Sequence, residues 1–221
     1  MIKNLIFDLD NTIILDKDSD SEYYKEALRN CGYDEENYYN IYMAIDEYDK
    51  LITEESMYYN KKEMLNTINQ VLHTDYSINL VDEIIRVIGQ YWTKRIILKE
   101  NIVNELVKKY NLYIYTNYFH EAQEKRIENI GYLNYFKKVF GADEYGSKPF
   151  KKSFENVLKE MNSKPEECIM IGDDKTRDIM AANNIGMKSI LYDYNGKRDK
   201  KEIELKNYIV INDMEELLKI L

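Results

Sequence analysis

Cysteine and histidine are scarce in this 221-residue chain, with two of each. Cys31 and Cys168 form no repeated spacing, so no disulfide framework is predicted, and two buried thiols in a reducing compartment explain them. His73 and His120 are too few, and too far from any cysteine pattern, to form a zinc site. Disulfide-rich and zinc-binding classes are therefore excluded.

Long apolar runs and basic stripes are also missing. No run reaches the roughly 18 apolar residues that a membrane-spanning helix needs, and the N-terminal stretch MIKNLIFDLDNT has no secretory core. We therefore expect a cytoplasmic protein without a membrane partner. A formal charge of −9 argues against a nucleic-acid polymer as partner, whereas a small anionic substrate needs a local concentration of cations.

Three common catalytic or nucleotide-binding motifs do not occur. The chain has no GxxxxGK[ST] loop and no strand-linked GxGxxG, so a glycine-rich nucleotide loop is not predicted. It also lacks the GxSxG turn of serine hydrolases. Any chemistry must therefore come from other residues.

Hydrophobic residues make up 44% of the chain and charged residues 32%, which is typical of a globular protein. Six short apolar runs without period-2 alternation predict buried parallel strands. They are Leu5–Leu9, Leu112–Tyr115, Lys138–Phe140, Cys168–Ile171, Ser189–Tyr192 and Tyr208–Ile211. Helical patterns over Asn101–Tyr110, Phe150–Met161 and Thr176–Gly186 separate them. This alternation predicts an α/β fold, a Rossmann-like parallel sheet with helices on both faces.

Residues 16–97 break the alternation, because they show helical periodicity only. Four amphipathic patterns occur there, over Tyr24–Cys31, Ile41–Tyr48, Met57–Leu72 and Val81–Trp92. We predict an all-helical subdomain over residues 16–97, inserted into an α/β core formed by residues 1–15 and 98–221. Asp16, Asp18 and Asp20 resemble the start of a calcium loop, but Ser21 and Ala27 replace its glycine and glutamate, which leaves an acidic linker.

Polar residues follow the ends of the predicted strands. Because ligands of parallel α/β sheets bind beyond the carboxyl ends of the strands, these residues are expected to share one edge. They are Asp8, Asp10 and Thr12, then Thr116 and Asn117, then Lys148, and finally Asp173, Asp174 and Asp178. Up to five carboxylates at one edge repel one another unless a cation lies among them. All-oxygen ligands favour a hard ion, and Mg²⁺ is the expected cofactor.

The motifs DLDNT, TN, SKP and GDDKTRD occur in the order and at the strand ends found in one family. In these motifs the chain resembles the haloacid dehalogenase-like hydrolase superfamily. The resemblance covers the whole chain and implies that residues 16–97 form a C1-type helical cap.

The resemblance implies a division of roles among these residues. Asp8 is the nucleophile that forms an aspartyl phosphate, and Asp10 is the acid and base. Mg²⁺ is held by Asp8, by the main-chain carbonyl of Asp10 and by Asp173. Thr116 and Lys148 stabilise the transferring phosphoryl group.

Five further residues have supporting roles. Asp174 and Asp178 act around the metal, through water or by orienting Lys148. Thr12 orients its loop. Asn117 either binds phosphate through its main-chain N–H or holds the turn. His120 is expected to begin a helix.

The presence of Asp10 favours a phosphatase. A dehalogenase expels halide, which needs no proton, and typically lacks both this second aspartate and the metal, whereas an alkoxide leaving group needs a proton. A covered site favours small phosphorylated metabolites such as sugar phosphates, phosphoglycolate or nucleoside monophosphates. Trp92, Lys94, Arg95 and tyrosines of the second helix are candidate contacts for the leaving group.

Two alternatives to a phosphatase remain. A phosphomutase would share the same core residues. A non-catalytic phospho-receiver is disfavoured by the long helical insertion and by the order of the acidic residues.

Overall fold

A six-stranded parallel sheet forms the centre of the molecule. The computed structural model describes residues 1–15, 20–55, 57–91, 95–194 and 208–221. The strands are β1 (Asn4–Phe7), β2 (Asn111–Tyr115), β3 (Phe136–Phe140), β4 (Cys168–Gly172), β5 (Lys188–Tyr192) and β6 (Ile209–Ile211). Their order in the sheet is β3-β2-β1-β4-β5-β6, with every pair parallel. All six predicted strands are confirmed, although the first ends at Phe7, so that Leu9 lies in the following turn.

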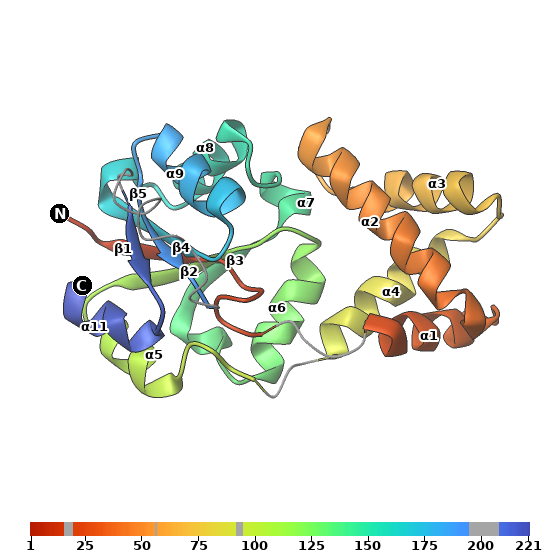
Figure 1. The fold of residues 1–221 in the computed structure, drawn as a ribbon, viewed down its shortest axis with the longest axis horizontal. Coiled ribbons are helices and arrows are strands. Elements are labelled where there is room, and N and C mark those ends of the chain that lie inside the picture. The colour runs from red at the N-terminus through yellow and green to blue at the C-terminus, as the bar shows by residue number, and fades with distance from the viewer. Residues whose placement is uncertain (16–19, 56, 92–94, 195–207) are drawn as a thin grey trace.

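Helices cover both faces of this sheet, as predicted (Figure 1). Successive side chains of a strand point to opposite faces, so Leu5 and Phe7 join one buried cluster and Ile6 joins another. The first cluster receives residues of α5 (Glu100–Leu106), α6 (His120–Asn129) and α11 (Leu217–Ile220), and the second those of α8 (Lys151–Glu160) and α9 (Ala181–Asn184). The short helix α7 is Ala142–Tyr145, and 3-10 turns occur at Glu35–Asn37, Leu133–Tyr135, Pro165–Glu167 and Met214–Glu216.

Four helices form a separate lobe beside the sheet (Figure 1). They are α1 (Asp20–Asn30), α2 (Tyr38–Glu54), α3 (Lys61–Leu72) and α4 (Ile78–Gln90), and they share one hydrophobic cluster. Each matches one of the four predicted helical patterns. The predicted start of the third helix at Met57 is too early. Asn60 caps α3 through its side chain, and Met57 lies in the preceding loop. Trp92 lies outside the described residues.

Two strand-like segments and one helix pair connect this lobe to the sheet. Ile14 and Ile96 form an antiparallel bridge, and the Leu15 amide donates to the Arg95 carbonyl at 3.0 Å. Helix α4 packs on α6 at Gly89, where an added Cβ would lie 3.2 Å from the Cα of Ala122. The side chain of Asn129 also donates to the Gly89 carbonyl at 3.0 Å. Helix α6 thus contacts both the sheet and the helical lobe.

Within the described part of the chain, no helix combines the length and the hydropathy needed to cross a membrane.

Candidate active site

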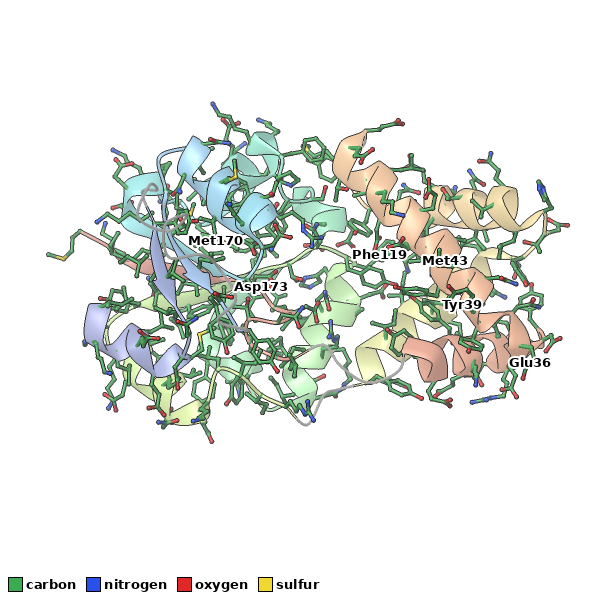
Figure 2. All side chains as sticks on the ribbon, viewed as in Figure 1. Glu36, Tyr39, Met43, Phe119, Met170 and Asp173 are labelled. Atoms are coloured by element: carbon green, nitrogen blue, oxygen red, sulfur yellow. The ribbon has the colours of Figure 1, made fainter. Side chains whose placement is uncertain are left out.

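Asp8 and Asp173 lie at the carboxyl edge of the sheet, directly after two neighbouring strands. The Asp8 amide donates to the Ile171 carbonyl at 2.8 Å, which continues the pairing of β1 with β4 and fixes where the Asp8 side chain starts. Asp173 follows β4, and Figure 2 shows it at this end of the sheet. The predicted convergence of these two carboxylates is therefore present.

Lys148 lies between two of the carboxylates. Its Nζ is 2.6 Å from Oδ1 of Asp8 and 2.6 Å from Oδ1 of Asp178. Lys148 is only 3% exposed and Asp178 only 1%, so water contributes little to solvating these charges. The neighbouring carboxylates outweigh the effect of burial and raise the pKa of Lys148, which keeps the ammonium charged.

The carboxylates of Asp8, Asp173 and Asp178 can hold a cation. One oxygen from each lies within 4.8 Å of the others. When all three are ionised, one ammonium leaves two negative charges, which matches a divalent ion. Burial, together with neighbouring carboxylates, raises the pKa of Asp8 to about 7 and that of Asp173 to about 6, although the charge of Lys148 opposes both shifts. A further cation would therefore favour the ionised forms. The all-oxygen donors and this charge fit Mg²⁺.

Asp10 lies apart from this cluster and is bound by an arginine. Arg126 donates to both of its carboxylate oxygens, at 2.6 and 3.1 Å. Arg126 also donates to Gln123 at 2.8 Å, and Gln123 in turn donates to the Thr116 hydroxyl at 3.1 Å. Helix α6 thus fixes the directions of two predicted site residues. Arg126 and Gln123 were missed in the sequence, although their three-residue spacing on a helix after Thr116 places them on one face.

Asn117 and Thr116 support the loop that carries Lys148. The side chain of Asn117 donates to the Lys148 carbonyl at 3.2 Å and accepts from the Lys148 amide at 2.9 Å. The Thr116 hydroxyl donates to the Asn117 carbonyl at 3.1 Å. The side chain of Asn117 thus holds the turn, one of its two predicted roles, and its main-chain role stays a prediction.

Asp174 and Asp178 behave differently from each other. Asp174 caps the next turn, accepting from the amides of Thr176 and Arg177 at 2.8 Å each and from Arg177 Nε at 2.9 Å. Asp178 accepts from the Asp174 amide at 3.1 Å and contacts Lys148. Both residues were predicted to act around the metal, through water or by orienting Lys148. Asp178 contacts Lys148, whereas Asp174 contacts Arg177, and a role through water stays a prediction for both.

The helix predicted from Thr176 is divided by a wide turn. Lys175–Met180 is a π-helical segment, followed by α9. Its Asp178 carboxylate lies against Gly172, where an added Cβ would be 2.2 Å from Oδ2. Such segments are frequent at functional sites.

Some buried polar side-chain atoms make no hydrogen bond within the described part of the protein. In the described ranges, four buried side-chain atoms have no hydrogen-bond partner: Thr12 Oγ1, the Tyr118 hydroxyl, His120 Nδ1 and Ser147 Oγ. All four follow β1 or β2 closely or precede Lys148. Buried polar groups are nearly always paired, so each of these atoms can bond a water molecule or a ligand.

The helical lobe contributes Asp49 and Tyr59 near the same region. The Tyr59 hydroxyl donates to Asp49 Oδ1 at 3.0 Å, and its ring packs at 5.8 Å from that of Tyr118. Burial raises the pKa of Asp49 to about 6, while the charge of Arg177 opposes that shift. Through Tyr59, Asp49 is thus linked to Tyr118 in the loop after β2.

The structure describes only some of the other predicted contacts. Trp92 and Lys94 are outside the described residues, and Arg95 is exposed. His120 begins α6 as predicted, and its amide donates to Asp143 at 2.7 Å. Figure 2 shows the neighbouring Phe119 between the sheet and α2.

This arrangement of a parallel sheet and acidic edge has a known counterpart. The model of the haloacid dehalogenase-like hydrolases matches residues 2–186, and the chain belongs to that hydrolase family. The predicted resemblance and fold class are confirmed.

Relatives with assigned activities share this family. A glyceraldehyde 3-phosphate phosphatase of Pyrococcus furiosus is 38% identical over 102 residues, which cover 45% of this chain and 42% of that enzyme. The alignment thus spans less than half of that relative. A glyceraldehyde 3-phosphate phosphatase of Methanocaldococcus jannaschii is 26% identical over 100% of this chain and 97% of its own length.

Among solved structures, the Bacillus subtilis hydrolase YfnB bound to magnesium has a similar fold. Its TM-score is 0.71 with 21% identity, covering 100% of this chain and 98% of that one.

Proposed function

We propose that this hydrolase is a Mg²⁺-dependent phosphatase that cleaves small phosphomonoesters through an aspartyl phosphate on Asp8. The observation that carries the proposal is the buried Lys148 between Asp8 and Asp178, beside Asp173, because it places a nucleophile, cations and metal ligands together. The separate carboxylate of Asp10 adds a proton carrier. The names of the relatives support phosphoryl esters as substrates.

The reaction divides into two displacements. In the first, an oxygen of Asp8 bonds to phosphorus while the bond to the leaving oxygen breaks, and Asp10 gives that oxygen a proton. In the second, Asp10 takes a proton from water, whose oxygen attacks phosphorus and releases phosphate and free Asp8. Arg126 fixes the direction of the Asp10 carboxylate in both.

Charge stabilisation comes from the groups around Asp8. Lys148 faces the phosphoryl oxygens, with nearby amides as further donors. The Thr116 hydroxyl, which donates to the Asn117 carbonyl in this structure, would turn from it to donate to the phosphoryl group. Asp8, Asp173 and the main-chain carbonyl of Asp10 would hold Mg²⁺, and an oxygen of Asp178 lies within the same carboxylate cluster as Asp8 and Asp173. When bound, Mg²⁺ supplies a fixed positive charge against the negative charge of the phosphoryl group.

The helical lobe, residues 16–97, is proposed to act as a cap on the α/β core. The core is formed by residues 1–15 and 98–221. The position of the lobe beside the sheet's carboxyl edge, joined through α4 and α6, suits it to cover the site and contact the leaving group. A covered site favours a small phosphorylated metabolite, with a sugar phosphate the first candidate.

The test is a panel of small phosphomonoesters and short haloacids, assayed with Mg²⁺, with Ca²⁺ and after exhaustive chelation. We expect phosphate release with Mg²⁺, little with Ca²⁺, which prefers more ligands, and none after chelation. Full activity without metal would contradict the role of Asp173. Halide release without phosphate release would contradict the role of Asp10, and interconversion of a sugar phosphate without net hydrolysis would show a phosphomutase.

A further inference from the structure

The hydroxyl of Tyr118 is buried and has no hydrogen-bond partner among the described residues. Tyr118 directly follows Thr116 and Asn117, and its φ of 90° lies in the left-handed region that side chains rarely adopt. Such backbone strain persists only where surrounding structure enforces it, and it is concentrated at functional sites. Two unfavourable features thus coincide in one residue beside the site.

Charges from both lobes surround this hydroxyl. Burial raises the pKa of Tyr118, the negative charge of Asp49 adds to that effect, and the positive charge of Arg126 opposes it. The phenol therefore stays protonated at neutral pH and can donate. Arg126, whose positive charge acts on this hydroxyl, also holds the proton carrier Asp10.

Asp49 offers the complementary acceptor. Within the described part of the chain its carboxylate accepts one hydrogen bond, from the Tyr59 hydroxyl, so its second oxygen can accept another. The rings of Tyr59 and Phe119 pack against that of Tyr118, at 5.8 and 5.1 Å between centroids, and fix its direction. Tyr59 thus contacts both residues, the acceptor Asp49 through its hydroxyl and the donor Tyr118 through its ring.

We propose that Tyr118 and Asp49 form the leaving-group subsite and select neutral leaving groups that carry hydroxyl or carbonyl oxygens. This inference rests on the proposed phosphatase function. The Tyr118 hydroxyl donates to an oxygen of the leaving group, and Asp49 accepts from one of its hydroxyls. A carboxylate on the leaving group is rejected by the charge of Asp49.

The experiment compares kcat/KM on three esters: glycerol 1-phosphate, n-propyl phosphate, which lacks the hydroxyls, and 3-phosphoglycerate, which carries a carboxylate. Wild type should prefer glycerol 1-phosphate to both. Tyr118→Phe should lower kcat/KM on glycerol 1-phosphate by about 5- to 10-fold, the value of one hydrogen bond, and on propyl phosphate by less than about twofold. Asp49→Asn should raise kcat/KM on 3-phosphoglycerate, relative to that on glycerol 1-phosphate, by about tenfold.

Tyr135→Phe is the matched control. Tyr135 lies just before β3, at the edge of the sheet opposite to the site, and its hydroxyl donates to Glu100 at 2.7 Å. This variant should leave all three values unchanged. Thermal unfolding separates a binding role from a structural one, since Tyr118→Phe removes an unpaired buried hydroxyl and should keep or raise Tm.

Three results would overturn the subsite: equal wild-type rates on glycerol and propyl phosphates, an equal effect of Tyr118→Phe on both esters, or a clearly lower Tm for that variant. Wild-type failure on every ester, by contrast, would overturn the phosphatase function itself.

Discussion

Burial raises the pKa of Asp49 from 3.8 to about 6, which makes its ionised form costly in the folded protein. Between these two values the folded state binds more protons than the unfolded state, so the free energy of unfolding falls as pH rises. This fall in the free energy of unfolding is complete above about pH 6. A carboxylate that reduces stability at neutral pH is consistent with a residue retained for binding.

Asp49→Asn should therefore stabilise the protein at pH 7.5 by about 1–2 kcal/mol, allowing for partial screening by water, and by almost nothing below pH 3.8. Asparagine keeps an acceptor for the Tyr59 hydroxyl. Urea unfolding of both proteins across this pH range measures the difference. Asp46→Asn, on the same helix beside Lys50, is the control and should change stability by about 0.5 kcal/mol or less at any pH. A difference for Asp49→Asn that does not change with pH would contradict the assigned cause.

At the scale of single residues, the sequence predicted those that follow strands and missed those that depend on packing. Asp8, Lys148 and Asp173 could be placed because strand ends are visible as apolar runs. Asp49 comes from a helix whose position against the sheet is set by tertiary contacts. Nothing in the local sequence near Asp49 indicates that position.

At the scale of elements, the strands and the start of α6 were predictable, whereas the inward face of α6 and the π-helical turn were not. Helix α6 reads HEAQEKRIEN, with too few apolar residues to show a clear period, so Arg126 and Gln123 went unnoticed. The π-helical turn at Lys175–Met180 has no sequence signature that distinguishes it from an α-helix. Its geometry becomes explicable only through the contacts of Asp178 with Lys148 and the Asp174 amide.

The close approach of β4 to this turn gives a test. Gly172→Ala places a Cβ against Asp178, so the carboxylate must move away from Lys148. We expect kcat to fall by about 10- to 100-fold, because small misplacements of catalytic groups are costly, with a loss of about 1–3 kcal/mol in stability.

Gly186→Ala is the matched control for this change. Its φ is 82° and an added Cβ meets nothing within 4 Å, so it should cost only about 1 kcal/mol of backbone strain. The kcat of this control should be that of wild type. An active Gly172→Ala variant would mean that the Asp178–Lys148 contact is dispensable.

For the whole molecule, the parallel sheet, its helical faces and the four-helix lobe all followed from hydrophobic periodicity. What periodicity does not contain is how the lobe docks on the sheet. That docking depends on Gly89 against Ala122 and on the Asn129 side chain, which are single residues without a repeating pattern. The leaving-group region lies between these two parts and was therefore the least predictable part of the site.

The central claim is that Asp8 carries the phosphoryl group and Asp10 carries the proton. Its most direct test is the mass of the peptide containing Asp8 after each variant is mixed with a nitrophenyl phosphate, whose leaving group needs little protonation. Asp10→Asn should accumulate an aspartyl phosphate on that peptide, because activation of water still lacks its base, and turnover should fall by about 10²- to 10⁴-fold. Asp8→Asn should form neither phosphoenzyme nor product. A phosphorylated peptide in Asp8→Asn, or identical burst and steady-state behaviour of the two variants, would contradict the account.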